Sequence, residues 1–537
     1  MSEDSLEERV EKTVAPAGTD AAEPPSRSRY AHYTQIPYRG IITVSVMLAA
    51  VMQALDTTIA NVALPHMQGT LSATQDQMGW VLTSYIVAVA ITIPLSGWLA
   101  GELGRRRVFL TSIALFVITS ALCGMATSLP EIVIFRFLQG VGGAALMPLS
   151  QATLFDINSP RNFGRAMSIW GIGVTLGPAL GPALGGWLTQ YYSWRWVFFI
   201  NLPIGILCFT GLLLTMPESR NEKSSRFDFF GFSVLSITLG SLQLLLDRGQ
   251  LLDWFSSTEI MIYAVAAGLG FYLFIIHMFS HPRPFLNPEL FRDRNFLAST
   301  VFIFVLGVVL FATLALQPPM LQNLMDYPVV LTGMITAPRG FGTFLSMFIV
   351  GRLVNRFDPR YIMAVGLVMS TYALWQMLHF SLTMDSSLVI WSGLLQGMGV
   401  GLVYVPLSAV AFTTLHGHLR NEGTAFFNLL RNMGSSIGIS VVFFLLTQNT
   451  QRLHSALGQN ITPYNVTNNP ALASLHIDPG TTSGLLALNH LVTDQGQMIA
   501  YLDDYKIMMV LSLLTLPFLL LIRRPHAAHD DQPVVIE

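Results

Sequence analysis

The stretch "IITVSVMLAAVMQALDTTIANVAL" (residues 41–64) is long and apolar enough to cross a lipid bilayer as one helix. It also contains a carboxylate, Asp56, well inside the apolar run. A carboxylate in hydrocarbon costs about 2.5–3.5 kcal/mol on insertion scales, so this residue calls for a functional or structural explanation. It is the only carboxylate that we expect in the middle of any span.

The composition of the whole chain also indicates a membrane protein. Of 537 residues, 52% are hydrophobic and 11% are charged, whereas soluble domains carry about 25% charged residues. The apolar runs are continuous rather than alternating, which predicts helices and not a transmembrane barrel. About fourteen such runs lie between residues 41 and 522, so the predicted fold class is an all-α membrane protein. The net charge of −2 does not bear on nucleic acid, but no basic patch suggests it, so we do not expect nucleic acid as a partner.

An internal repeat divides the predicted helices into two groups of six. "GWLAGELGRRRVF" (97–109) matches "GRLVNRFDPRYIM" (351–363), and "FLQGVGGA" (137–144) matches "LLQGMGVG" (394–401), at offsets of 254 and 257 residues. Two homologous bundles with two extra helices between them explain the repeat, as in many secondary transporters. The expected segments are a disordered cytoplasmic tail (1–40), an N-terminal six-helix bundle (41–216), a linker with two additional transmembrane helices (217–295), a C-terminal six-helix bundle (296–522) that includes an exterior loop (448–502), and a cytoplasmic tail (523–537).

The basic residues predict the orientation of the chain. With both termini in the cytoplasm, 22 of the 29 Lys and Arg residues fall in cytoplasmic segments, 4 fall outside and 3 lie within spans. This bias follows the positive-inside rule and requires an even number of helices. The last part of the exterior loop has the apolar spacing of a helix. Such a helix would lie on the outer membrane surface, meet a partner or simply pack within the loop.

Five motifs in order along the chain resemble one known family. They are "LDTTIANVALP" (55–65), "GELGRRR" (101–107), "RFLQGVGGA" (136–144), "GVTLGPALGPALGG" (173–186) and "WRWVFFINLPIG" (194–205). Together they resemble the major facilitator superfamily and, within it, the fourteen-spanner drug:proton antiporters of the EmrB-like multidrug efflux subfamily.

The resemblance implies a function, partners and a location. The chain would export hydrophobic or amphiphilic drugs by alternating access, use the proton gradient and need no cofactor. It would lie in the bacterial inner membrane, bind small substrates and protons, and work with a periplasmic membrane-fusion adaptor and an outer-membrane channel. An exporter of one specific metabolite or fatty acid, and a receptor or scaffold without transport, are the alternatives. Phosphate-loop, HExxH and GxSxG motifs are absent from the sequence, so we expect no enzyme, and the pair His416 and His418 is not expected to bind metal.

Asp56 and Arg136 are the predicted proton-coupling residues. Asp56 lies about 8 residues, or roughly 12 Å, from the outer end of its helix, and Arg136 lies about 5 residues, or roughly 8 Å, from the same face. The two charges are therefore expected at similar depth. Desolvation and a nearby cation act on a carboxylate in opposite directions, which suits it to bind and release a proton. A static ion pair or a helix–helix hydrogen bond is the alternative.

A second candidate feature is a glycine-rich helix that resembles the antiporter motif of the family. Glycines every four residues share one face, so another helix can approach closely, and the prolines permit a bend. Close packing without a transport role explains the same pattern. The predicted packing residues are Gly173, Gly177, Pro178, Gly181, Pro182, Gly185 and Gly186.

Two further groups of residues complete the predicted site. The first is a cytoplasmic gate, a role that the resemblance to the family implies and for which anchoring by the positive-inside rule is an equal alternative; its residues are Gly97, Gly104, Arg105, Arg106 and Arg107. The second is a set of polar side chains expected to line a substrate cavity, although hydrogen bonds between helices or to backbone carbonyls explain them as well. Its members are Gln53, Asn61, Gln139, Gln151, Arg339 and Arg431.

Overall fold

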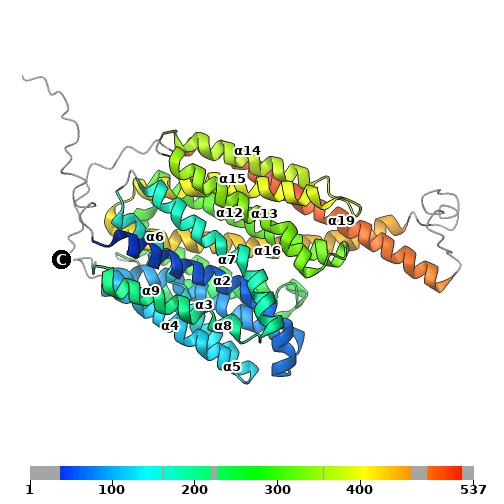
Figure 1. Cartoon of the computed structure of the whole chain (residues 1–537), viewed down its shortest axis with the longest axis horizontal. Coiled ribbons are helices and arrows are strands. Elements are labelled where there is room, and N and C mark those ends of the chain that lie inside the picture. The colour runs from blue at the N-terminus through cyan, green and yellow to red at the C-terminus, as the bar shows by residue number, and fades with distance from the viewer. Residues whose placement is uncertain are drawn as a thin grey trace, which may run out of the picture. The chain divides into compact units, whose positions relative to one another are not determined.

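The computed structural model describes residues 37–159, 162–218, 227–282, 284–354, 356–459, 461 and 481–522. The predicted tails lie outside these ranges, apart from residues 37–40 at the start of the first helix. Every regular element in the described part of the chain is a helix (Figure 1). The predicted all-α membrane fold is confirmed.

The helices follow the chain in three groups. The first group is α2 (Arg39–Leu71), α3 (Gln75–Leu103), α4 (Arg105–Met125), α5 (Leu129–Gly143), α6 (Leu146–Ile157), α7 (Phe163–Tyr191), α8 (Trp196–Phe199) and α9 (Asn201–Thr215). The second is α10 (Phe229–Arg248) and α11 (Thr258–Ser280). The third is α12 (Arg294–Pro319), α13 (Val329–Leu353), α14 (Pro359–Met377), α15 (Ser386–Thr413), α16 (Arg420–Gly458) and α19 (Thr482–Leu514). Five short helical segments lie between or after these helices along the chain: η5 (Trp254–Ser256), η6 (Pro288–Phe291), η7 (Met320–Leu324), η8 (Gly417–Leu419) and η9 (Pro517–Leu521).

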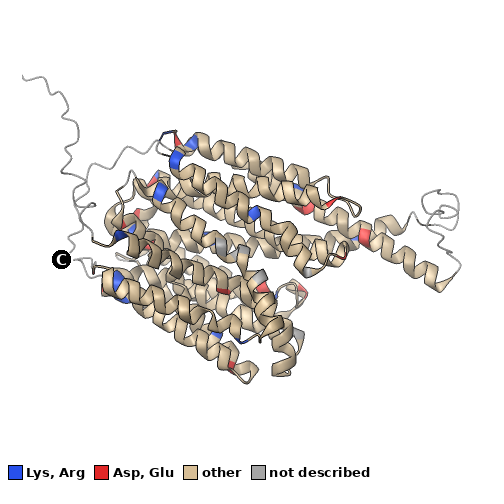
Figure 2. Cartoon of the chain, viewed as in Figure 1, with Lys and Arg blue, Asp and Glu red and all other residues tan. Residues whose placement is uncertain are grey.

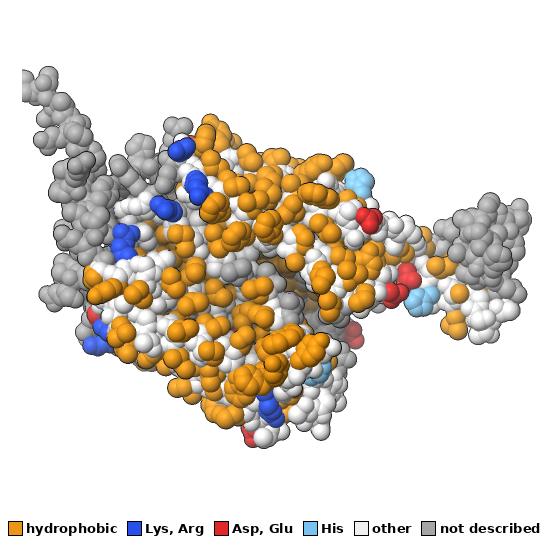
Figure 3. Space-filling view, in the orientation of Figure 1, with side chains coloured by type: hydrophobic (Ala, Val, Ile, Leu, Met, Phe, Trp, Pro, Cys, Tyr) orange, Lys and Arg blue, Asp and Glu red, His pale blue; other side chains and the backbone are white. Residues whose placement is uncertain are grey.

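Eleven segments among the described residues are long and apolar enough to cross a membrane. Two of these join consecutive helices, α5 with α6 and α8 with α9. Three more helices of comparable length, α7, α13 and α14, lie between these segments along the chain. Together with the eleven segments they fit the predicted fourteen membrane-spanning helices. Apolar side chains cover the face of the molecule seen in Figure 3, as expected for a surface in contact with lipid.

Local sequence explains where several helices begin. Thr74 caps α3 through a reciprocal capping box with Gln77. Aspartates cap four other helices by accepting a hydrogen bond from a backbone N–H of the first turn; they are Asp228, Asp293, Asp358 and Asp385. Such caps satisfy donors that have no partner within the helix.

The first and third groups pack mainly within themselves. In the first group, α2 lies along α7 and α9, and α5 packs between α3 and α4. In the third group, α15 lies along α13 and α14, while α16 lies along α12 and α19. The main contacts between the two groups are α7 with α13 and α3 with α16. Helix α10 packs on α3 and α11, so the two extra helices are attached to the first group.

Both ends of the predicted exterior loop at 448–502 are helical, and residues 460 and 462–480 within it lie outside the described part of the chain. Helix α16 continues to Gly458, and α19 begins at Thr482 and runs without a break into the last span. At 1.5 Å per residue, the 39 residues of α16 extend roughly 58 Å, about twice the hydrocarbon thickness of a bilayer. The two helices lie together beyond the other helices (Figure 1), where the position of a Cβ on Gly496 is 3.4 Å from the backbone nitrogen of His454.

Candidate functional site

Asp56 sits at the centre of a buried hydrogen-bond network. Its side chain is fully buried, and its Oδ2 accepts a hydrogen bond from Nη1 of Arg136 at 2.7 Å. Its Oδ1 accepts hydrogen bonds from Nε2 of Gln139 at 2.9 Å and from Nδ2 of Asn201 at 3.0 Å. Helices α2, α5 and α9 therefore converge on one carboxylate, which is satisfied as an anion.

Arg136 is held from several sides as well. Its Nε donates to the backbone oxygen of Val81 at 3.2 Å, and its Nη1 also donates to Oε1 of Gln139 at 2.9 Å. The guanidinium lies 4.2 Å from the ring centroid of Tyr85, a cation–π contact. Because both charges are removed from water, loss of either one would leave the other buried and unpaired.

The glycine face of α7 packs directly on α2. A Cβ on Gly177 would lie 2.6 Å from Cβ of Ala54, and one on Gly185 would lie 2.9 Å from Cγ1 of Ile59. Gly173 and Gly181 face Met47 and Thr58 in the same way. Gly186 leaves more room, because its Cβ would lie 4.0 Å from Cγ1 of Val62, also on α2. The side chains of Pro178 and Pro182 lie outside the described part of the structure.

The predicted gate residues separate into two groups. Arg105 is buried and joins the first and third helix groups, because its Nε and Nη2 donate to Oδ1 of Asn421 and its Nη1 pairs with Asp156. Gly97 also packs on α16, where its Cβ would lie 3.0 Å from Cα of Glu422. Arg420 pairs with the same Asp156 at 3.5 Å. These residues link the two groups at the end of the molecule where α4 and α16 begin.

The other gate residues stay within the first group. Gly104 has φ +90°, a conformation that favours glycine. Arg106 donates to the backbone oxygen of Leu213, and the exposed Arg107 lies 3.6 Å from Glu218. Lys and Arg residues gather toward the end of the view where α14 begins (Figure 2).

The six side chains predicted to line a substrate cavity do not form one cluster. Gln139 belongs to the Asp56 network. Gln53 accepts a hydrogen bond from the backbone N–H of Met147. Gln151 binds the hydroxyl of Tyr404 on α15 at 3.0 Å and accepts a hydrogen bond from Asn428 on α16 at 2.6 Å. Gln151 thus bridges the first and third helix groups.

The remaining three cavity predictions have different environments. Asn61 is exposed. Arg431 is half-buried on α16. Arg339 is 4% exposed, and none of its three guanidinium nitrogens has a hydrogen-bond partner among the described residues.

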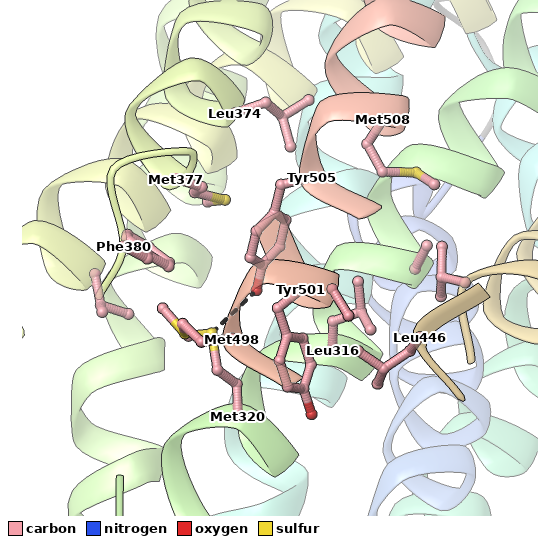
Figure 4. Packing of buried hydrophobic residues seen from close by; sticks show 14 of the residues in the cluster. Leu316, Met320, Leu374, Met377, Phe380, Leu446, Met498, Tyr501, Tyr505 and Met508 are labelled. Carbon is pink, nitrogen blue, oxygen red and sulfur yellow. Dashed lines mark hydrogen bonds between the residues drawn. The ribbon is translucent and has the colours of Figure 1, made fainter. Parts of the chain in front are cut away.

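Sequence reasoning missed a second fully buried carboxylate within a helix, Asp504. It lies within α19, is 0% exposed, and neither of its oxygens has a hydrogen-bond partner among the described residues. Tyr501 and Tyr505 of the same helix lie in a cluster of buried apolar side chains (Figure 4). The expectation that Asp56 is the only such carboxylate is therefore wrong. The sequence places Asp504 at the edge of the last predicted span, because the first part of α19 was predicted to belong to the exterior loop at 448–502. The helical spacing of that segment was the signal that could have revealed it.

One cluster of metal-ligating side chains occurs among the described residues, away from Asp56. Ligand atoms of Asp228, His277 and His281 lie within 4.8 Å of one another. Asp228 already accepts hydrogen bonds from Gly231 N, Phe285 N and His277 Nε2 at 2.8–3.0 Å. Its carboxylate thus caps α10 and joins it to the end of α11.

The sequence and the fold both match known proteins. The model of the Major Facilitator Superfamily matches residues 46–439. The fatty acid resistance protein FarB of Neisseria gonorrhoeae is 34% identical over 90% of this chain and 96% of that protein. The multidrug export protein EmrB of Escherichia coli K12 is 34% identical over 86% of this chain and 90% of that protein.

Solved structures agree at the level of the fold. The human organic anion transporter MFSD10 aligns with a TM-score of 0.57, covering 90% of this chain and 100% of that one at 14% identity. The proton:xylose symporter XylE aligns with a TM-score of 0.55, covering 90% and 97% at 14% identity. These identities are too low to carry more than the architecture.

Proposed function

Since the chain belongs to the major facilitator superfamily and to its EmrB-like branch, we propose that it exports hydrophobic or amphiphilic compounds in exchange for protons. Its relatives EmrB and FarB are named for multidrug export and for fatty acid resistance. The observation that carries the proton-coupling part is the buried pair of Asp56 and Arg136. A charged pair maintained within an apolar helix bundle is costly and typically marks an ion or proton pathway.

The contacts between helix groups support transport by alternating access. Arg105, Asp156 and Asn421 tie the two groups together at one end, and Gln151 bridges them further along the helices. With the orientation predicted by the basic residues, the tied end is cytoplasmic. In this arrangement the substrate site faces outward, and the compound leaves when Asp56 takes a proton from the outside.

The projecting parts of α16 and α19 are the proposed docking surface for a periplasmic adaptor, which would in turn meet an outer-membrane channel. Leu485 and Leu486 near the start of α19 are 57% and 64% exposed. Exposed apolar side chains beyond the membrane region fit a protein contact. The location that goes with this proposal is the bacterial inner membrane, with both termini in the cytoplasm.

A transport assay in liposomes tests the proposal. We expect a pH gradient to drive the movement of ethidium, a lipophilic cation, in the parent protein. The same gradient should drive much less movement in Asp56→Asn. Equal export by Asp56→Asn under the gradient would refute the coupling role of Asp56, and the absence of any gradient-driven transport would favour a receptor or scaffold.

A narrower substrate range is the second candidate function. The similarity to FarB, over 96% of that protein, favours export of fatty acids. Dodecanoate serves as the probe for this alternative in the same liposomes. Transport of dodecanoate without transport of ethidium would select the fatty acid exporter, and transport of both would select the multidrug exporter.

A further inference from the structure

The two extra helices bring three metal-ligating side chains together at the end where α10 begins and α11 ends. Asp228 is the N-cap of α10, His277 lies in the last turn of α11, and His281 is the C-cap of α11. One ligand atom from each residue lies within 4.8 Å of the other two. No local motif indicates this cluster, because Asp228 and His277 are 49 residues apart and only the packing of α10 on α11 joins them.

Two of the three ligands are already held in position. Oδ1 of Asp228 accepts a hydrogen bond from Gly231 N at 2.9 Å, and Oδ2 accepts one from Phe285 N at 3.0 Å. Nε2 of His277 lies 2.8 Å from the same Oδ2. Both side chains are largely buried. The carboxylate and the imidazole are therefore oriented before any ligand arrives, which lowers the cost of binding one.

The surroundings of this pair leave room for it and exclude water. A Cβ on Gly231 would overlap with Oδ2 of Asp228 and lie 3.1 Å from Cδ2 of His277, so a side chain here would push the two ligands apart. The rings of Phe230 and His277 are 4.9 Å apart, centroid to centroid, and Phe285 is buried. Apolar neighbours lower the local dielectric constant, which strengthens the attraction between a cation and a carboxylate.

His281 supplies the third ligand from the solvent side. It is exposed, and its ring centroid lies 4.9 Å from that of His277. Ligand atoms about 2.1 Å from a tetrahedral ion are roughly 3.4 Å from one another. The pair of Asp228 and His277 at 2.8 Å would open slightly, and His281 would close from at most 4.8 Å. Because His281 follows the last residue of α11, its ring can move without breaking the helix.

We propose that Asp228, His277 and His281 bind a divalent transition-metal ion such as Zn²⁺, which ties the start of α10 to the end of α11. Two imidazoles and a carboxylate suit this ion, with water in the fourth position. In the bound form Nε2 of His277 gives its lone pair to the ion, and the proton of its hydrogen bond moves to Nδ1 of the same ring.

The position of the cluster gives the ion a structural effect beyond the two helices. Phe285, whose N–H binds the same carboxylate, begins the segment that leads through η6 to α12. A bound ion would thus also fix the connection from the extra helices to the third helix group. With the orientation proposed above, this end faces the cytoplasm. The inference is separate from the proposed export and does not depend on it.

Calorimetry on the full-length protein tests the site. The protein is purified in micelles without a polyhistidine tag, freed of metal by a chelator that is then removed, and titrated with ZnCl₂. We expect binding that saturates at one ion per chain in the parent. His281→Ala should bind about tenfold more weakly or worse, because one of three ligands is lost. An absence of saturable binding in the parent, or equal affinity in His281→Ala, would overturn the proposal.

The matched control is His418→Ala. His418 is also an exposed histidine near a carboxylate, with its Nε2 3.9 Å from Oε2 of Glu289. We expect His418→Ala to bind Zn²⁺ like the parent. A loss of binding in His418→Ala that matches or exceeds the loss in His281→Ala would place the ion elsewhere and refute the site. His281→Ala is preferred to a variant of Asp228, because Asp228 also caps α10.

Co²⁺ is a spectroscopic probe of the same site. A tetrahedral Co²⁺ ion absorbs visible light far more strongly than the hydrated ion. We expect this absorption in the parent and in His418→Ala, its loss in His281→Ala, and its removal by added Zn²⁺. A spectrum in the parent that stays that of the hydrated ion would contradict the proposal. Neither measurement involves transport, so both decide the metal site whether or not ethidium is carried.

Discussion

Nη1 of Arg136 lies 2.7 Å from Oδ2 of Asp56, and both side chains are at most 1% exposed although 80 residues separate them in the chain. Removing one partner of a buried ion pair leaves the other uncompensated, at a cost of about 3–5 kcal/mol. The pair is thus a structural constraint as well as a candidate for proton coupling.

Stability and transport should separate in a double-mutant cycle of this pair. We expect Asp56→Asn to lower the free energy of unfolding by about 3–5 kcal/mol, because Arg136 then stays buried without a counter-charge. The double variant Asp56→Asn/Arg136→Gln should recover part of that stability but no gradient-driven transport. Thermal unfolding in micelles and ethidium transport in liposomes measure the two effects. Arg136→Gln completes the cycle, and a double variant whose loss of stability equals the sum of the two single losses would show that the charges are not coupled.

The close approach of α7 and α2 predicts that alanine substitution has different effects at two glycines of α7. Gly177→Ala places a methyl group 2.6 Å from Cβ of Ala54 and 2.8 Å from the backbone of Leu55, so we expect a loss of about 1–3 kcal/mol in stability and weaker export. Gly186→Ala is the matched control, because its nearest neighbour is 4.0 Å away. Thermal unfolding and export are measured for both. A Gly177→Ala protein as stable and active as Gly186→Ala would contradict the packing role.

Arg105 should hold the two helix groups together at their tied end. We expect Arg105→Gln to weaken that contact by about 1.5–3 kcal/mol, the range for hydrogen bonds to charged groups. The ratio of molecules with separated helix groups to molecules with tied groups should then rise on the order of tenfold or more. Arg107→Gln is the control, because that side chain is 74% exposed. Spin labels at the exposed residues Leu103 and His416 report the separation by pulsed distance measurements. Unchanged distances in Arg105→Gln would exclude this role.

Asp228 predicts a pH-dependent contribution to stability. Burial disfavours its charged form, but the Gly231 N–H, the His277 ring and the Phe285 N–H outweigh burial and hold the pKa of this carboxyl below its usual value. A lowered pKa in the folded state stabilises the protein above the unfolded pKa of about 4, and this contribution is lost as the pH falls through the folded pKa.

The variant Asp228→Asn measures this contribution. We expect it to cost about 1 kcal/mol or more near neutral pH, as for the loss of a helix cap, and less in acid. Thermal unfolding of both proteins across this pH range gives the difference, with Asp385→Asn as a comparison at an exposed cap. A difference that grows as the pH falls would contradict the lowered pKa.

The sequence by itself determined the class of fold and picked out two of the charged residues within the helices, Asp56 and Arg136. Continuous apolar runs predicted the helices, and the repeat predicted the grouping of the spans before α10 and after α11. The depth of Asp56 and Arg136 followed from counting residues along each helix. These are local or periodic properties, because rise and span length depend only on residues near in sequence.

The tertiary structure alone decided which side chains meet. That Asn201 and Gln139 bind Asp56, that Gln151 bridges to Tyr404 and Asn428, and that Asp504 is buried all depend on how helices rotate and pack against one another. The partners are 83 to 277 residues apart in the chain for these hydrogen bonds. A helix of given sequence can present any of its faces to a neighbour, and only the packing of the whole bundle selects one.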